Sequence, residues 1–104
     1  MTKIGSLVSS KLKNYVYMYS DPMTKDPFYV GRGKGNRVFD HLKNTQTDVF
    51  KRIEQIRKEN GAEPLIEILI HGLDENTAKK VESAVIDLIG KEKLVNKQLG
   101  TLFL

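Results

Sequence analysis

Hydrophobic and polar residues alternate near the start of the chain in a way that is typical of a β-strand. Residues 13–20 alternate with a period of two, which places Tyr15, Tyr17 and Tyr19 on one face of the predicted strand. The next segment, residues 21–27, contains two prolines and two aspartates, which favour a hairpin loop. We therefore expect a tyrosine-lined strand that leads into a hairpin.

A second, shorter strand is predicted over residues 28–30, and the glycines at positions 31, 33 and 35 are expected to end it. Asn36 is the expected N-cap of a short helix that runs to about Asn44. A second helix is predicted over residues 48–59, where apolar residues keep helical spacing.

Residues 65–70 are apolar on both faces apart from Glu67, which is typical of a central strand that helices cover on both sides. Asp74 is the expected N-cap of a third helix that ends at Gly90. The predicted order is thus β-β-α-α-β-α. It indicates an α+β fold with a small three-stranded antiparallel sheet flanked by helices.

These elements divide the chain of 104 residues into three segments. Residues 1–12 are predicted to be an irregular lead-in, residues 13–97 a single folded domain, and residues 98–104 a C-terminal tail. The tail ends in Phe103 and Leu104, so we expect either that it packs on the domain or that the chain was cut from a longer one.

Composition excludes several classes of function. The chain has no cysteine, which rules out disulfides, cysteine-ligated zinc and thiol catalysis. No apolar run approaches the ~20 residues of a membrane span, and no signal peptide is present, so we expect a soluble cytoplasmic protein without a membrane partner. The net charge of +4 is only a weak indication of a polyanionic partner.

Glu82 breaks the amphipathic pattern of the third predicted helix. The apolar arc of that helix consists of Ala78, Val81, Ala84, Val85, Ile86, Leu88 and Ile89. Glu82 falls inside this arc, where a carboxylate is costly unless it is paired or bound to a cation. Two interpretations stay open: a salt bridge or an arc edge that reaches water, and a catalytic or metal-binding carboxylate. A single carboxylate suits Mg²⁺, which keeps most of its water ligands.

Tyr17 and Tyr29 lie on successive strands of the predicted hairpin. Because neighbouring strands are about 4.8 Å apart, two tyrosines on one face can bring their hydroxyls together. This pair is either a structural aromatic contact or part of a reactive site. Of the two histidines, His71 is expected to be structural, whereas His41 shares a helix face with Arg37 and is the better functional candidate.

The run Gly31-Arg32-Gly33-Lys34-Gly35 follows the second strand and leads into a helix. Backbone amides exposed by glycine, together with a helix N-terminus and the two basic side chains, favour an anion such as phosphate. The alternative is a flexible turn with solvated charges. The run fits neither a Walker motif nor a dinucleotide-binding fingerprint.

Taken together, these residues resemble the GIY-YIG nuclease superfamily. The match consists of Tyr15-Val16-Tyr17 in place of Gly-Ile-Tyr, Tyr29-Val30-Gly31 in place of Tyr-Ile-Gly, the basic Arg32 that follows, Arg37 and His41 on the next helix, Glu82 on a later helix, and Asn96. The stretch from residue 28 to residue 42 is most similar to the subgroup that includes the LEM/ankyrin-domain nucleases and their bacterial and phage relatives. Tyr15 departs from the family pattern, because glycine is usual there.

The resemblance implies an endonuclease that hydrolyses DNA phosphodiester bonds with a single Mg²⁺ or Mn²⁺ ion. It implies that Glu82 binds the metal, that Tyr17 is the general base and that Tyr29 positions the water or the phosphate. Arg37 would stabilise the transition state, His41 would bond to a tyrosine or a phosphate, and Asn96 would buttress the site. We expect nearby cations, Arg32 and Lys34 among them, to favour the phenolate form of Tyr17.

The sequence leaves the biological substrate open. The chain is expected to contact the DNA phosphate backbone, either as a homodimer, as a domain that acts on branched or non-specific DNA, or as part of a protein with a separate specificity domain. RNA fits the same features. The alternatives to a nuclease are a non-catalytic nucleic-acid-binding module with the same fold, and a nucleotide or small-anion binder that uses the glycine-rich turn.

Overall fold

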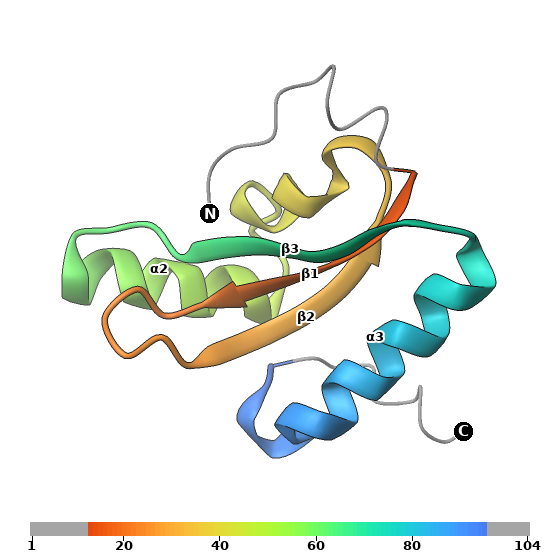
Figure 1. Ribbon diagram of the computed structural model, residues 1–104. Coiled ribbons are helices and arrows are strands. Elements are labelled where there is room, and N and C mark those ends of the chain that lie inside the picture. The colour runs from red at the N-terminus through yellow and green to blue at the C-terminus, as the bar shows by residue number, and fades with distance from the viewer. Residues whose placement is uncertain (1–12, 96–104) are drawn as a thin grey trace.

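The computed structural model describes residues 13–95, which form a three-stranded sheet with helices packed on it (Figure 1). The elements in chain order are β1 (Asn14–Ser20), β2 (Pro27–Gly33), the 3-10 helix η1 (Gly35–Leu42), α2 (Asp48–Asn60), β3 (Leu65–Leu73), α3 (Glu75–Ile89) and the 3-10 helix η2 (Lys91–Lys93). This order confirms the predicted α+β fold. Asn96, residues 1–12 and residues 98–104 lie outside the described residues.

The central strand of the sheet is β1, not β3 as the apolar run at residues 65–70 predicted. The strand order is β2-β1-β3, and both pairings are antiparallel. Leu69 and Ile70 on β3 are each 41% exposed, because α3 packs mainly on β2 and β1. An apolar run indicates a strand but does not tell which strand lies in the middle, since position in the sheet depends on contacts distant in sequence.

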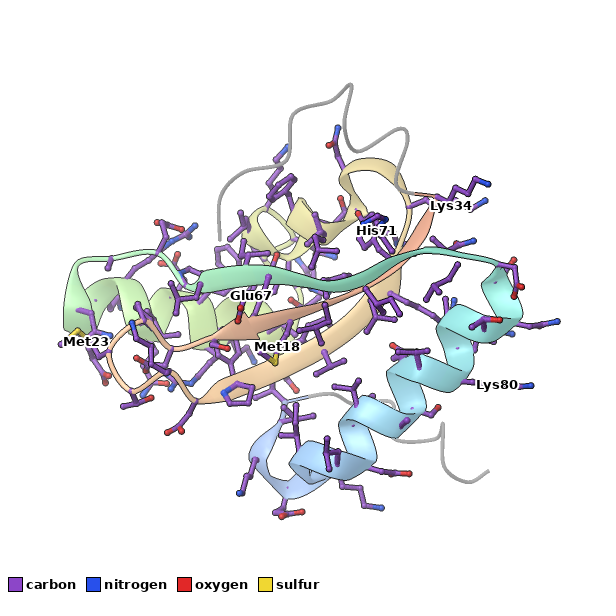
Figure 2. All side chains as sticks on the ribbon, viewed as in Figure 1. Met18, Met23, Lys34, Glu67, His71 and Lys80 are labelled. Atoms are coloured by element: carbon purple, nitrogen blue, oxygen red, sulfur yellow. The ribbon has the colours of Figure 1, made fainter. Side chains whose placement is uncertain are left out.

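The β2 strand extends beyond residue 30 and includes Gly31 and Gly33. These glycines pair with Tyr17 and Tyr15 of β1, so they continue the ladder rather than end it. On the other side of β1, Met18 pairs with Glu67 of β3 (Figure 2). The prediction that the strand ends at residue 30 was therefore wrong. Gly31 packs closely against Tyr17 of β1, and Gly33 packs against Arg37 of η1.

The sheet separates two apolar clusters, one on each face. On one face, the tyrosines of β1 pack against residues of η1 and α2, including Val38, Ile53 and Ile56. On the other face, Val16 and Val30 pack against Ile86 of α3. Side chains alternate between the two faces along β1, so the tyrosines of this strand lie in one cluster and Val16 lies in the other. The two faces are thus covered by different helices (Figure 1).

The hydroxyl groups of two tyrosines fix the backbone of η1 to the sheet. Tyr15 donates a hydrogen bond to the carbonyl of Gly35 over 2.5 Å and accepts one from the amide of Val38 over 3.1 Å. Tyr19 donates to the carbonyl of Val38 over 2.5 Å. Both rings are fully buried. A tyrosine can fill a core position only when its hydroxyl has such a partner, and here the partner is the helix that the core must hold.

Side-chain caps set the ends of the two α-helices. The Thr47 hydroxyl accepts a hydrogen bond from the amide of Phe50 at the start of α2, and Gly61 in the left-handed conformation ends that helix. Asp74 accepts from the amide of Thr77 at the start of α3, as predicted. By contrast, Asn36 is not the cap of η1, because this 3-10 helix begins one residue earlier, after Lys34, without a side-chain cap.

The buried face of α3 is narrower than the sequence predicted. Leu88 is 86% exposed and Ala84 is also exposed, whereas Ile86 is 1% exposed. The helix contacts only one sheet face, so the apolar residues at the margins of the arc reach water. None of the helices in residues 13–95 is long and apolar enough to cross a lipid bilayer.

Two substitutions in α3 test this packing. We expect Ile86→Ala to lower the free energy of unfolding by about 2–5 kcal/mol, because it removes fully buried apolar atoms and leaves a cavity. The matched variant Leu88→Ala should change it by less than about 0.5 kcal/mol, because the side chain is in water. Urea unfolding followed by circular dichroism measures both. A similar loss in the two variants would contradict this placement of α3.

Candidate active site

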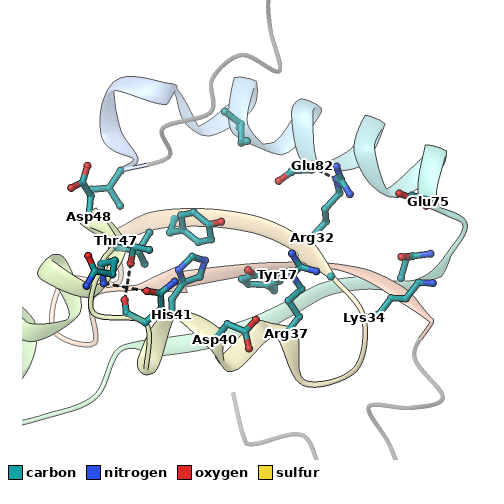
Figure 3. Close-up of a pocket in the computed structure, with 18 residues that line it drawn as sticks. Tyr17, Arg32, Lys34, Arg37, Asp40, His41, Thr47, Asp48, Glu75 and Glu82 are labelled. Atoms are coloured by element: carbon teal, nitrogen blue, oxygen red, sulfur yellow. Dashed lines mark hydrogen bonds and ion pairs between the residues drawn. The ribbon is translucent and has the colours of Figure 1, made fainter.

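A pocket of about 850 Å³ lies beside β2, between η1 on one face of the sheet and α3 on the other (Figure 3). It brings together eight of the residues singled out from the sequence: Tyr17, Tyr29, Arg32, Gly33, Lys34, Arg37, His41 and Glu82. They come from β1, β2, the turn into η1, η1 and α3, so no single element forms the site. Gly31 and Gly35 do not line it, and Asn96 is outside the described residues.

Tyr17 and Tyr29 meet at the floor of the pocket. Their ring centroids are 6.0 Å apart, and their hydroxyls share a hydrogen bond. Tyr17 is only 2% exposed, whereas Tyr29 is partly exposed. The pair is therefore a packed aromatic contact whose two residues also line the pocket, and its part in a reactive site stays a prediction.

The surroundings of the pair favour the protonated forms. Burial is the main cause that raises the pKa of Tyr17 far above its usual value, and Tyr29 and Tyr19 raise it further. Burial also raises the pKa of Tyr29, although the hydrogen bond with Tyr17 partly offsets this. We expected cations to favour the phenolate of Tyr17. In the protein alone, burial and the neighbouring tyrosines govern the pKa of Tyr17, and the effect expected of the cations and of a bound metal stays a prediction.

Gly31 allows the close approach of the two tyrosines. A Cβ atom at this position would lie 2.6 Å from the Tyr17 hydroxyl oxygen and 2.9 Å from Cε2 of Tyr29. At Gly33, a Cβ atom would lie 2.9 Å from Cβ of Arg37. The role predicted for Gly31 and Gly35 in binding an anion is thus not supported by the structure. The glycine of β2 makes room for side chains that do line the pocket.

Glu82 enters the pocket from α3 and meets Arg32 of β2. Its Oε1 atom lies 3.1 Å from Nε of Arg32, and its side chain is 17% exposed. Burial raises the pKa of the Glu82 carboxyl, while Arg32 lowers it. The structure thus shows the salt bridge of the first interpretation. Glu82 also lines the pocket, and the second interpretation, a catalytic or metal-binding carboxylate, stays a prediction.

The donor set fits a metal ion that needs few protein ligands. Within residues 13–95, no three His, Asp or Glu side chains cluster closely enough to hold a metal ion among them. A half-buried carboxylate at an open, water-accessible cavity is nevertheless suitable for Mg²⁺ or Mn²⁺, which can take its remaining ligands from water and from phosphate oxygens. A zinc site of several histidines is not compatible with this arrangement.

Arg37 and His41 project from η1 toward the pocket (Figure 3). The guanidinium of Arg37 is exposed and can reach an anion in solution. The His41 ring packs edge-on against Tyr29, with the centroids 4.6 Å apart, and burial lowers its pKa. The Nδ1 atom of His41 is buried and makes no hydrogen bond within the described part of the chain. Because its pKa is lowered, the His41 imidazole beside Tyr29 is neutral at pH 7.

Three acidic side chains of the pocket were not singled out from the sequence: Asp40, Asp48 and Glu75. Asp48 and Glu75 begin α2 and α3, where an acidic residue is ordinary because it interacts favourably with the helix dipole. Asp40 is next to His41, and this adjacency was the one signal that could have indicated it. The His71 side chain is exposed on β3 and does not line the pocket (Figure 2).

A family model described as the LEM-3-like GIY-YIG domain matches residues 9–103, which is nearly the whole chain. No curated protein and no solved structure matches the sequence. The match covers every element that lines the pocket.

We predict that Gly31→Ala disturbs the tyrosine pair. The added Cβ should lower the free energy of unfolding by about 1–3 kcal/mol and change the near-ultraviolet circular dichroism of the tyrosines. The matched variant is Gly72→Ala, where φ is +76° and the surrounding space is open. It should lose stability through backbone strain alone and keep the tyrosine spectrum. An unchanged spectrum in Gly31→Ala would show that the pair does not depend on this contact.

Proposed function

This chain belongs to the LEM-3-like GIY-YIG domain family, and we propose that it is a metal-dependent endonuclease that hydrolyses DNA phosphodiester bonds. One observation carries the proposal. A tyrosine pair, a half-buried carboxylate and several cations border one pocket, although Tyr17 and Glu82 are distant in sequence. Phosphodiester hydrolysis needs these three kinds of group: one for the attacking water, one for a metal ion and one for the negative charge of the phosphate.

Glu82 is the residue that would hold the single Mg²⁺ or Mn²⁺ ion. When bound, such an ion neutralises charge on the scissile phosphate and on the leaving oxygen. From α3, Glu82 lines the same pocket as the tyrosine pair, and its carboxylate meets Arg32 there.

Tyr17 and Tyr29 would orient the attacking water and take its proton. Because the pKa of both hydroxyls is raised, each is protonated at neutral pH and can accept a hydrogen bond from water. Proton removal requires a phenolate, so the rate depends on how much phenolate the pair forms. The hydrogen bond raises the pKa of Tyr17 and lowers that of Tyr29, so Tyr29 is the hydroxyl of the pair that loses its proton more readily. With Tyr29 as the phenolate, Tyr17 would pass its own proton to Tyr29 as it takes one from the attacking water, which keeps Tyr17 as the base that contacts the water.

The cations of the pocket would bind the phosphate and stabilise its extra charge in the transition state. Arg37 is exposed at the pocket, and Lys34 and Arg32 border it on the β2 side. Guanidinium groups suit phosphate because they can donate two parallel hydrogen bonds to it. His41 would hold the Tyr29 ring in place through their edge-on contact. Asn96 is assigned a supporting role on the resemblance alone.

A non-catalytic nucleic-acid-binding module is the second candidate. The ion pair between Arg32 and Glu82 favours it, since a carboxylate that is already paired has no need of a metal ion. A binder of this kind would use the same cations on the DNA backbone. The two candidates differ in one respect, because only a nuclease loses its function when Glu82 is removed while DNA binding remains.

We predict that Glu82→Ala reduces metal-dependent nicking of supercoiled plasmid by on the order of a thousandfold, because it removes the metal ligand. Folding and DNA binding should remain largely intact. Cleavage would be measured on plasmid and on a branched DNA, with Mg²⁺ or Mn²⁺ against EDTA. The matched control is Glu75→Ala, another acidic residue of the pocket on α3, which should cut within a few-fold of the wild type.

Each outcome of this experiment separates the candidates. Continued cutting by Glu82→Ala would remove Glu82 as the metal ligand. DNA binding without any cutting by the wild-type protein would favour the binding module. The comparison of plasmid with branched DNA would show which DNA shape the pocket prefers.

The raised pKa of the tyrosine pair predicts a specific pH dependence. Below its pKa, the phenolate fraction grows about tenfold with each pH unit, so cleavage by the wild type should rise steeply from about pH 7 to pH 9. Tyr17→Phe should lose about 10²–10⁴-fold in rate and show a flatter profile, because a phenyl ring cannot take the proton of the water or pass it to Tyr29. Single-turnover cleavage at several pH values tests this. A pH-independent rate in the wild type would contradict a tyrosine base.

A further inference from the structure

The ion pair between Arg32 and Glu82 occupies the carboxylate that the proposed mechanism assigns to a metal ion. It joins β2 to α3, and its two residues are 50 positions apart in the sequence. Nε of Arg32 lies 3.1 Å from Oε1 of Glu82 (Figure 3). The Glu82 side chain is 17% exposed and that of Arg32 is 35% exposed. The carboxylate is thus the more enclosed partner, and the guanidinium is the partner with space to move.

A guanidinium and a divalent cation compete for such a carboxylate. A metal ion binds a carboxylate oxygen at about 2.1 Å, which would place it within a few ångströms of a guanidinium that is hydrogen-bonded to the same group. Two cations at that separation repel each other strongly in a partly buried site. One of them must therefore leave, unless an anion arrives to neutralise the second positive charge.

We propose that Arg32 is the counter-ion of Glu82 before the metal binds, and that a DNA phosphate takes over the guanidinium and so frees the carboxylate for the metal. The inference rests on the proposed function, because it takes Glu82 as the metal ligand. Arg32 is then a positioning residue that couples phosphate binding to metal binding. A phosphate at the pocket is a better partner for the guanidinium than a carboxylate on one hydrogen bond, because it can be bound through two.

This exchange makes metal and phosphate binding positively cooperative. Without phosphate, the metal must displace Arg32 and binds weakly. With phosphate bound, Arg32 is engaged elsewhere, and the metal finds an unpaired carboxylate. By thermodynamic linkage, the metal must strengthen phosphate binding by the same factor. As a result of this cooperativity, the metal ion binds tightly only when a DNA phosphate is already bound.

The direct test measures Mn²⁺ affinity in the absence of DNA, by electron paramagnetic resonance of free Mn²⁺ or by calorimetry. We expect Arg32→Gln to bind Mn²⁺ roughly fivefold more tightly than the wild type, which is the upper range for removal of a partly exposed ion pair. Lys34→Gln is the matched control, because it removes the same charge from the same pocket while the Arg32–Glu82 pair remains. It should change the affinity by less than about twofold. Glu82→Gln should abolish binding at this site.

The pattern of results separates the inference from the proposed function. If Glu82→Gln abolishes Mn²⁺ binding but Arg32→Gln binds no more tightly than Lys34→Gln, the metal site stands and the competition is wrong. If Glu82→Gln leaves Mn²⁺ binding unchanged, both the metal site and the inference fall. Circular dichroism of each variant confirms that it is folded.

A second measurement tests the Arg32 guanidinium through DNA-binding affinity, without any metal ion. In EDTA, Glu82→Gln should bind a short DNA duplex more tightly than the wild type, because Arg32 is released toward the phosphate. The same substitution in an Arg32→Gln background should give a clearly smaller gain, since only the general loss of negative charge remains. Equal gains in the two backgrounds would show that Arg32 does not pass from Glu82 to the phosphate.

Discussion

The hydrogen bonds from Tyr15 and Tyr19 fix η1, which forms one side of the pocket, to the central strand of the sheet. Both hydroxyls come from the central strand, and between them stands Tyr17, whose own hydroxyl is left to face Tyr29 and the pocket. The three tyrosines on this face of β1 thus have different roles. Tyr15 and Tyr19 anchor η1, and Tyr17 lines the candidate site. Because η1 also carries Arg37 and His41, these two bonds determine where those two side chains lie relative to Tyr17. The anchoring role of Tyr15 also accounts for a large side chain where the family usually has glycine.

The sequence was sufficient to predict those parts of the fold that depend on local chemistry. The alternation of β1, the helical spacing of apolar residues in α2 and the Asp74 cap of α3 all involve residues close in the chain, and the structure confirms them. The features that could not be predicted depend on contacts distant in the chain. The edge position of β3, the continuation of β2 through Gly31 and the exposure of Leu88 are set by which surface packs on which.

The candidate site divides in the same way. Tyr17, Tyr29, Arg37, His41 and Glu82 were indicated by their order and by the resemblance to a family, and the structure brings them to one pocket. What the sequence could not give was their electrostatic state. The raised pKa of Tyr17 results from burial among other tyrosines, and the partner of Glu82 comes from a strand that packs beside α3. Both effects arise from tertiary packing, as does the position of the acidic residues that begin α2 and α3.

The two outer strands of the sheet differ in character, and this has a consequence for the protein in concentrated solution. The β2 edge is bordered by the charged pocket, whereas β3 displays Leu69 and Ile70 to water. An outer strand with apolar side chains and unpaired backbone groups is a ready template for a strand of another molecule, while charged side chains discourage such pairing. Within residues 13–95, aggregation of partly unfolded molecules is therefore expected to start at β3. β3 lies at the sheet edge opposite to β2 and its pocket, so a ligand held in the pocket would give this outer strand no protection.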